Sequence, residues 1–324
     1  MLDKNGRNID YLRVSLTDRC NLRCVYCMPE EGIHQIPRME ILDTDEIVRV
    51  CRVASELGIS KIKLTGGEPL VRKICIPLVK ELKALPGISE VTLTTNGILL
   101  AEQLPELMKA GLDAVNISLD TLAAETFERI TRRSALPQVL QGLEKALSYP
   151  SLKVKVNCVP TFQPEADLIQ IAGLARENLL HVRFIEMMPI GLGKEFTARG
   201  EEQIKAVLER EYGKMIPANE HLGNGPCHYY TLENFVGRIG FISALSHKFC
   251  DSCNRVRLTS TGFLKGCLQF ENGADLKTFI RGNCTDERLK KVIEKVIYEK
   301  PVGHNFQERR NGNEESHIMA QIGG

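Results

Sequence analysis

The 324-residue sequence has no tryptophan, no long apolar run and almost no excess charge of either sign. A membrane-spanning helix needs about 18 or more consecutive apolar residues, and no stretch approaches that length. Lys and Arg number 42 against 41 Asp and Glu, so the formal net charge is +1. That balance argues against a general nucleic-acid binder or a membrane-surface protein, and any anion site must be a local cluster of basic side chains.

A targeting segment is also lacking at the N-terminus. The opening residues MLDKNGRNIDYL contain no apolar core and carry Asp3 and Asp10, unlike a signal peptide or an Arg-rich transit peptide. We therefore expect a cytoplasmic protein with neither nucleic acid nor membrane among its partners. At roughly 150 residues per domain, the length predicts about two domains.

Cysteine, in contrast, is abundant, with eleven residues. An odd number without a secretion signal favours metal or redox ligands over disulfides. Six of them form two triplets: Cys20, Cys24 and Cys27, then Cys250, Cys253 and Cys267. The other five are scattered and are expected to be small apolar residues: Cys51, Cys75, Cys158, Cys227 and Cys284.

Short β-branched runs alternate with amphipathic stretches between residues 10 and 190, at the spacing of a βα unit. Consecutive βα units predict a parallel α/β sheet, either open and doubly wound or curved into a partial barrel. Both architectures place their chemistry at the carboxyl ends of the strands. The expected strands are 11–16, 61–65, 91–95, 114–119, 153–159 and 181–186. The expected helices are 44–57, 77–85, 101–110, 123–131, 137–147 and 165–177.

The pattern changes near residue 198. Helices are expected at 201–212 and 286–298, and strands at 235–243 and 255–259. The polar, Gly-rich segment 309–324 is expected to be poorly ordered by itself. We therefore predict two domains, 1–197 and 198–324, the second of mixed α+β structure.

The first cysteine triplet directly follows the first expected strand. Three thiolates suit a soft metal, and because a [4Fe–4S] cluster takes four cysteines for full ligation, three would leave one iron open for chemistry. A zinc site with a distant fourth ligand is the alternative. The sequence Gly66-Gly67-Glu68-Pro69 after the next strand weighs against zinc, because paired glycines let the backbone approach a ligand closely.

The second triplet leaves three interpretations open on spacing alone. His247 precedes Cys250 by three residues, so a closed zinc site of three cysteines and one histidine is one of them. The others are an electron-transfer cluster and a second cluster with an open iron.

The spacing Cys20-x3-Cys24-x2-Cys27, with Tyr26 before the last cysteine, resembles the signature of the radical S-adenosylmethionine (SAM) superfamily. This resemblance implies a partial (β/α)6 barrel and a [4Fe–4S] cluster whose open iron chelates SAM. It also implies that reduction of the cluster releases a 5′-deoxyadenosyl radical, which the protein must orient and shelter. The SAM-binding positions that it implies are Tyr26, Gly67, Glu68, Ser118 and Met188.

Segments 11–20, 237–243, 246–258 and 322–324 closely resemble one radical SAM family, the GTP 3′,8-cyclases of molybdenum cofactor biosynthesis, and the likeness extends from Gly6 to Gly324. The resemblance implies that the second triplet holds another [4Fe–4S] cluster, which binds the guanine of GTP, and that His247 is a structural residue. The implied reaction removes hydrogen from C3′ of the ribose and joins C3′ to C8, giving 3′,8-cyclo-7,8-dihydro-GTP.

This resemblance implies that several basic residues bind GTP. The implied GTP contacts are Arg13, Lys63, Thr94, Lys155, Arg255, Val256 and Arg257. Lys63 departs from the family, where Arg is commoner, and Lys keeps the charge but loses the bidentate fork. The resemblance implies catalytic roles for the first triplet, for Arg13, Arg255 and Arg257, and for Gly323 and Gly324, a tail that enters the active site.

The family also implies a low-potential electron donor of the flavodoxin or ferredoxin type and a downstream cyclic pyranopterin monophosphate synthase, and it allows a homodimer. Two other classes of protein remain open. One is a radical SAM enzyme that modifies a peptide with the help of an auxiliary cluster. The other is not an enzyme but an iron–sulfur electron carrier or a zinc-stabilised binding module.

Overall fold

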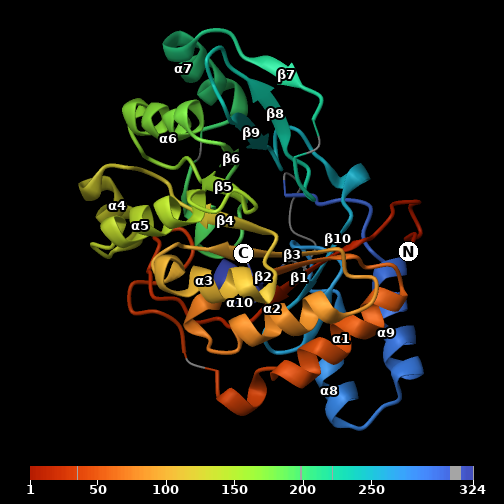
Figure 1. The fold of residues 1–324 in the computed structure, drawn as a ribbon. Helices are drawn as coiled ribbons and strands as arrows, with labels where there is room; N and C mark the ends of the chain where they lie inside the picture. The colour runs from red at the N-terminus through yellow and green to blue at the C-terminus, as the bar shows by residue number, and fades with distance from the viewer. Residues whose placement is uncertain (35, 198, 221, 307–314, 324) are drawn as a thin grey trace.

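A single curved sheet organises the molecule (Figure 1). The computed structural model describes residues 1–34, 36–197, 199–220, 222–306 and 315–323. The strand order is β12-β11-β10-β1-β2-β3-β4-β5-β6-β9-β8-β7. Its six middle strands are parallel and follow the order of the sequence: β1 (Tyr11–Ser15), β2 (Lys61–Thr65), β3 (Glu90–Thr95), β4 (Ala114–Ser118), β5 (Lys153–Cys158) and β6 (Leu180–Ile185).

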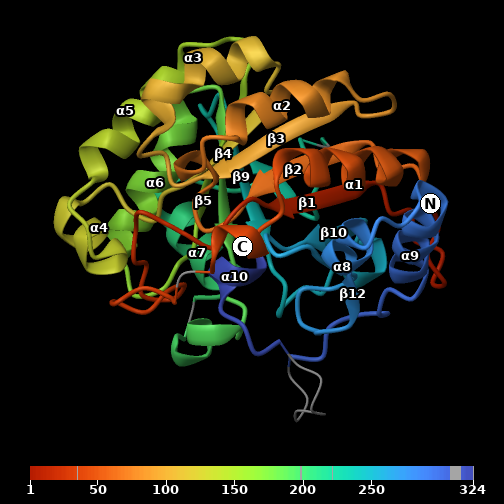
Figure 2. The same ribbon diagram turned by 90° about the horizontal axis from the view of Figure 1, so that it is seen from below.

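Helices cover the outer face of these strands, as Figure 2 shows. They are α1 (Thr44–Glu56), α2 (Cys75–Ala84), α3 (Leu100–Ala110), α4 (Ala124–Thr131), α5 (Leu136–Leu147) and α6 (Glu165–Glu177). Helix α1 shows why they form where they do. Asp43 and Glu46 make a capping box at its start, and buried Ile47, Val50 and Ala54 recur at helical spacing on the face toward the sheet. The partial barrel predicted from the sequence is confirmed, with these boundaries correct to within two residues.

The C-terminal part adds strands to both edges of the same sheet. At one edge β9 (Arg238–Ile242) runs parallel to β6, followed by antiparallel β8 (His228–Thr231) and β7 (Ile216–Ala218). At the other edge β10 (Arg255–Leu258) runs parallel to β1, followed by antiparallel β11 (Phe263–Lys265) and β12 (Gly273–Asp275). The remaining helices are α7 (Glu201–Tyr212), α8 (Leu276–Arg281), α9 (Asp286–Tyr298) and α10 (Met319–Ile322). The division at 197/198 stays a prediction.

Two expectations for this part need correction. Strand β9 begins at Arg238, three residues later than expected, because the preceding residues form a turn in which Phe235 N–H donates to the carbonyl of Leu232 and Asn234 has φ 64°. The tail is also more regular than expected, since Met319–Ile322 forms helix α10 near the open end of the barrel (Figure 2). Residues 309–314 and Gly324 of the expected tail lie outside the described residues.

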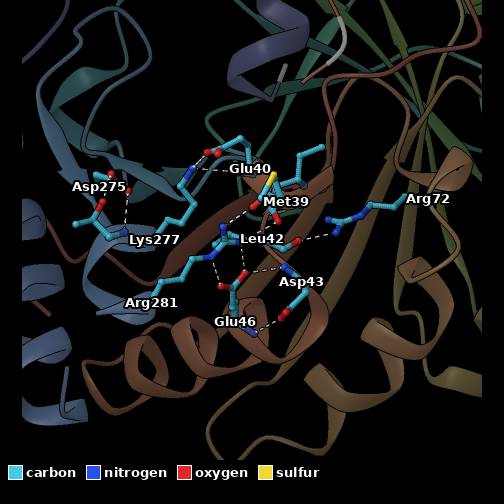
Figure 3. A network of polar contacts seen from close by, with 11 residues as sticks. Met39, Glu40, Leu42, Asp43, Glu46, Arg72, Asp275, Lys277 and Arg281 are labelled. Atoms are coloured by element: carbon cyan, nitrogen blue, oxygen red, sulfur yellow. Dashed lines mark hydrogen bonds and ion pairs between the residues drawn. The ribbon is translucent and has the colours of Figure 1, made fainter. Parts of the chain in front are cut away.

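Charged side chains connect α8 to α1 and to the segment before it (Figure 3). Arg281 donates to the two carboxylate oxygens of Glu46 at 2.6 and 3.0 Å, and to the carbonyl oxygens of Met39 and Ile41. Lys277 pairs with Glu40. Helix α8 is thereby attached to the barrel. None of the helices in the described part of the chain has the length and apolar character needed to cross a bilayer.

Candidate active site

A cavity of about 340 Å³ lies inside the curve of the sheet and is lined by residues from all six parallel strands and from both cysteine triplets. Most residues predicted to bind SAM line it: Cys20, Cys24, Tyr26, Cys27, Gly67, Ser118 and Met188. So do most residues predicted to bind GTP or the second cluster: Arg13, Lys63, Thr94, Lys155, Arg255, Arg257, Cys250, Cys253 and Cys267. Among the described residues the exceptions are Glu68, Val256 and Gly323.

The two triplets lie at opposite ends of neighbouring strands. Strands β1 and β10 are parallel, with Tyr11 beside Arg255. Cys20 follows the carboxyl end of β1, whereas Cys253 precedes the amino end of β10. Five residues of strand measure about 17 Å. The region between the triplets is therefore long enough to hold two small molecules in sequence.

The first triplet occupies a half-buried loop supplied with N–H donors. Cys20 Sγ accepts from the backbone N–H of Leu22 at 3.4 Å and from the side chain of Asn96 at 3.7 Å. Burial raises the pKa of Cys20 to about 11 and, together with repulsion from Cys20, that of Cys27 to about 12. A bound metal reverses that preference, because it stabilises the thiolate directly.

Gly66 and Gly67 hold this loop against β2. A Cβ atom on Gly67 would lie 2.4 Å from the carbonyl oxygen of Arg19, and one on Gly66 would lie 2.6 Å from that of Thr17. The backbone N–H of Gly67 donates to Thr17 O at 2.6 Å. The paired glycines therefore allow two backbone segments to pack at a distance that any side chain would prevent.

Glu68 is buried behind the cavity lining rather than in it. Its carboxylate accepts from Leu70 N at 3.0 Å, Thr95 Oγ1 at 2.7 Å and Asn96 N at 2.7 Å. Burial raises the pKa of Glu68 to about 7, although these donors partly offset it. In this structure Glu68 fixes the end of β3 beside the cysteine loop.

Asp120 is a cavity residue that follows β4 and that the sequence reasoning did not single out as a ligand. Its carboxylate accepts from Tyr26 Oη at 2.7 Å and from Val159 N at 2.8 Å. Burial raises the pKa of Asp120 to about 6. The rule that functional residues follow parallel strands was the signal that could have found it.

The second triplet lies among cations. Burial alone would raise the pKa of Cys253, but Arg255 and Lys300 outweigh it and bring the value to about 6. Cys250 Sγ accepts from the backbone N–H of His304 at 3.4 Å. His247 instead contacts Glu201, Nδ1 to Oε2 at 3.4 Å, with its side chain 52% exposed.

Both triplets offer three thiols to one cavity. Thiolates are the ligands that hold iron–sulfur clusters, so the residues present fit such a group at each end of the cavity. Three protein thiols would leave one iron of a [4Fe–4S] cluster free to bind a small molecule there.

Buried and half-buried basic side chains line the cavity between the triplets. Arg13 lies in register with Lys63 on one side and with Arg257 on the other, so the three side chains point to the same face of the sheet. Burial, followed by repulsion from Arg183 and Arg13, lowers the pKa of Lys63 well below its ordinary value. Burial, followed by repulsion from Arg13 and Arg255, lowers the pKa of Arg257 in the same way. Such a cluster favours a multiply charged anion.

Arg183 is a further cavity cation that the sequence reasoning missed. It lies on β6, and its guanidinium donates to Asn157 Oδ1, with Nε at 2.9 Å. Arginine in the middle of a parallel strand that is apolar apart from His181 was the available signal, because both faces of such a strand are normally buried.

Three predicted positions remain to be located: Val256, Gly323 and Gly324. The side chain of Val256 is 1% exposed and packs in the core, on the face of β10 opposite to Arg255 and Arg257. The carbonyl oxygen of Gly323 accepts from Arg257 Nη1 at 2.7 Å. Gly323 has φ 75°, and a Cβ there would lie 2.8 Å from Ser15 Cβ. Gly324 lies outside the described residues.

A curved parallel sheet with a cysteine triplet after its first strand, facing the cavity inside the curve, is typical of the radical SAM class. The model of the Radical SAM superfamily matches residues 14–175, and that of Molybdenum Cofactor Synthesis C matches residues 180–306. Solved structures show the same fold: SuiB of Streptococcus suis has a TM-score of 0.59 at 17% identity, over 92% of this chain and 68% of SuiB.

Curated relatives narrow the class to a family. A GTP 3′,8-cyclase of Clostridium perfringens is 45% identical over the full length of both chains. A GTP 3′,8-cyclase of Syntrophomonas wolfei is also 45% identical, again over the full length of both. The chain therefore belongs to the GTP 3′,8-cyclase family, as the sequence motifs predicted.

Proposed function

We propose that this protein binds SAM and GTP in one cavity and converts GTP to 3′,8-cyclo-7,8-dihydro-GTP, an early step of molybdenum cofactor biosynthesis. The observation that supports it best is the row of buried cations between two sets of three thiols, which lie at opposite ends of neighbouring strands. A peptide-modifying enzyme has no need of such a row. The likeness to SuiB, at 17% identity, concerns the fold alone.

Cys20, Cys24 and Cys27 would hold a [4Fe–4S] cluster that, when bound with SAM, supplies a 5′-deoxyadenosyl radical. The chain's own contribution is to place and enclose SAM. Tyr26, Gly67, Ser118 and Met188 line the cavity on this side and would contact SAM. Glu68 would act from behind the lining by fixing the loop, and the apolar wall keeps water away from the reacting carbon.

Cys250, Cys253 and Cys267 would hold a second [4Fe–4S] cluster that binds guanine. Arg13, Lys63, Lys155, Arg255 and Arg257 would neutralise the triphosphate, with Thr94 and the backbone of Val256 completing the contacts. Arg side chains can grip phosphate with two parallel hydrogen bonds, whereas Lys63 contributes a point charge. The Gly323–Gly324 tail would approach the same ligand, since Gly323 already contacts Arg257.

Several wider features belong to the same proposal. We expect residues 1–197 to form the SAM-binding module and residues 198–324 the substrate module. We also expect a flavodoxin- or ferredoxin-type electron donor, a downstream cyclic pyranopterin monophosphate synthase and a cytoplasmic location, and the proposal allows a homodimer.

The decisive experiment follows a deuterium atom. Protein reconstituted anaerobically with iron and sulfide is given a reductant, SAM and GTP deuterated at C3′, and the 5′-deoxyadenosine formed is analysed by mass spectrometry. Deuterium in that product is the expected result, because hydrogen removal from C3′ transfers it there. Iron analysis of the same sample should give about eight irons per chain and no zinc.

Two variants act as controls. Cys24→Ala should abolish 5′-deoxyadenosine, whereas Cys284→Ala, which removes a thiol distant from both triplets in the sequence, should leave it unchanged. Abundant 5′-deoxyadenosine without deuterium would contradict the proposed substrate or the proposed abstraction site. Its complete absence, with both clusters verified, would contradict the enzymatic function.

A further inference from the structure

The C-terminal tail carries a buried carboxylate that reaches the barrel wall. Glu315 is 4% exposed and forms an ion pair with Lys265, which is 1% exposed and ends strand β11. Charged residues are almost never fully buried unless they are paired. A pair buried this deeply, between a chain end and a sheet, therefore indicates a specific attachment rather than a chance surface contact.

The residues around Glu315 reinforce this attachment. Its backbone N–H donates to the carbonyl oxygen of Gln269 at 2.7 Å. His317 donates to Glu315 Oε1 from its backbone N–H at 2.9 Å and contacts it through Nδ1 at 2.7 Å. Ser316 donates to Glu271 Oε1 from its backbone N–H at 3.1 Å. Glu315 and Ser316 are thus joined to the segment 269–271 by separate polar contacts, and His317 contacts Glu315 within the tail.

The same tail is held a second time at its other end. Strands β11 and β10 are antiparallel neighbours, and Lys265 lies directly opposite Arg257. Lys265 binds Glu315, while Arg257 donates to the carbonyl oxygen of Gly323. Two adjacent basic residues of the sheet therefore hold the two ends of the segment 315–323, and helix α10 lies between these points.

We propose that Glu315 is a positioning residue: its ion pair with Lys265 determines where the tail joins the barrel and so places Gly323 against Arg257 in the active site. The attachment limits the volume that residues 318–323 can explore, which raises their effective concentration at the cavity. The inference rests on the proposed function in one respect, namely that the tail takes part in the GTP reaction.

The test compares Glu315→Gln with the wild-type full-length protein, both carrying reconstituted clusters. Glutamine keeps the size and an acceptor for His317 but removes the charge that holds Lys265. Hydrogen–deuterium exchange of peptides covering 318–323 is the first measurement, with steady-state kinetics and GTP affinity measured on the same samples. We expect at least tenfold faster exchange in that segment and at least a tenfold lower kcat. We expect the Kd for GTP to change by less than about twofold, because the cavity cations are untouched.

Matched variants separate positioning from general damage. Glu106→Gln breaks an exposed ion pair with Lys109 on α3 and should change none of these measurements. Lys265→Met should reproduce the faster exchange, and combining it with Glu315→Gln should add no further acceleration, since both remove one contact. If Glu315→Gln protein does not fold, Glu315→Asp keeps the charge on a shorter side chain and should show an intermediate increase in exchange.

The results distinguish this inference from the proposed function. Unchanged exchange of 318–323 in Glu315→Gln would overturn the attachment, whatever the enzyme's activity. Faster exchange with an unchanged kcat would overturn the positioning role. If the wild-type protein makes no product from GTP, the proposed function fails, and the exchange measurement still decides whether Glu315 holds the tail.

Discussion

At the scale of single residues, Gly67 decides whether the first cysteine loop can form. Its missing side chain lets the carbonyl oxygens of Asp18 and Arg19 approach to distances of 2.6 and 2.4 Å from an idealised Cβ position. Gly67→Ala should therefore push this loop away and destabilise the fold by about 1–3 kcal/mol or more. We expect SAM affinity, measured by calorimetry on the reconstituted protein, to fall at least tenfold.

Gly200 provides the matched control for that substitution. It is the N-cap residue of α7 and has nothing within 4 Å of an added Cβ, so Gly200→Ala should leave SAM affinity unchanged and lower stability by less than about 1 kcal/mol, the cost of alanine at an N-cap. If Gly67→Ala and Gly200→Ala bind SAM with the same affinity, the close packing at Gly67 is not needed for SAM binding.

His181 provides a residue-scale prediction of pH dependence. Burial, with repulsion from Lys155, Arg238 and Arg183, lowers its pKa to about 4. An unfolded chain binds this proton near pH 6.5, so the stability contributed by His181 is complete above that value and is lost as the pH falls toward 4. NMR titration of its imidazole, assigned with His181→Gln, should give the low pKa. Adding GTP should raise that pKa, because the triphosphate neutralises the nearby cations; a pKa near 6.5 without ligand would contradict this account.

Some residues of the candidate site could be predicted from the sequence, and others could not. The cysteines, Gly67 and Arg13 could be predicted, because their spacing and the residues next to them are informative. Arg183 and Asp120 could not be assigned contacts, since Tyr26 and Asp120 meet only when β4 lies beside the cysteine loop. Val256 was predicted from resemblance, yet strand alternation places its side chain in the core.

At the scale of secondary structure elements, α8 is attached to the barrel by unequal contacts (Figure 3). Arg281 makes a two-point contact with Glu46, whose side chain is 12% exposed, and also binds backbone carbonyls. Lys277 contacts Glu40, whose side chain is 50% exposed. Arg281→Ala should reduce the free energy of unfolding by about 1–3 kcal/mol, and Lys277→Ala by less than about 1 kcal/mol.

Urea denaturation of the two variants beside the wild type measures both values. Arg281 also lowers the pKa of Glu46, so its stabilisation should weaken as the pH falls through the ordinary range of a carboxyl group. A Lys277→Ala effect as large as that of Arg281→Ala would contradict this ranking of the contacts.

Sequence patterns predicted the long elements better than the short ones. Helices such as α6 and α9 carry three or more turns of apolar periodicity, and their expected limits were correct. Strands β7, β8, β11 and β12 are three or four residues long and were not predicted. So short a strand has too few residues to show alternation, and only its partner across the sheet defines it.

At the scale of the whole molecule, one sheet is shared by the two parts of the chain. Strand β10 joins β1 and β9 joins β6, so the residues after 198 close both sides of a cavity that the first part opens. The recurring βα units predicted the parallel sheet, and the resemblance to the radical SAM superfamily predicted that it curves into a partial barrel. Those units contained no information on where distant strands would add, because that pairing depends on contacts between residues far apart in the sequence.

The buried cations of this cavity should make the free protein less stable than its complex with GTP. Like charges in a low-dielectric interior repel, and a bound triphosphate relieves that repulsion while adding mass-action stabilisation of about 2.7 kcal/mol at a ligand concentration of 100 Kd.

Lys63→Met should therefore have two opposite effects on stability, one without GTP and one with it. Without ligand it should raise the free energy of unfolding, because it removes a buried charge whose pKa is already strongly lowered. With GTP it should show a smaller increase in Tm than the wild type, because a phosphate contact is lost. Lys109→Met on the exposed face of α3 is the control and should alter neither value. Thermal unfolding with and without GTP, and with guanosine in place of GTP, measures all of these. A Tm increase from guanosine equal to that from GTP would contradict the role assigned to the cations.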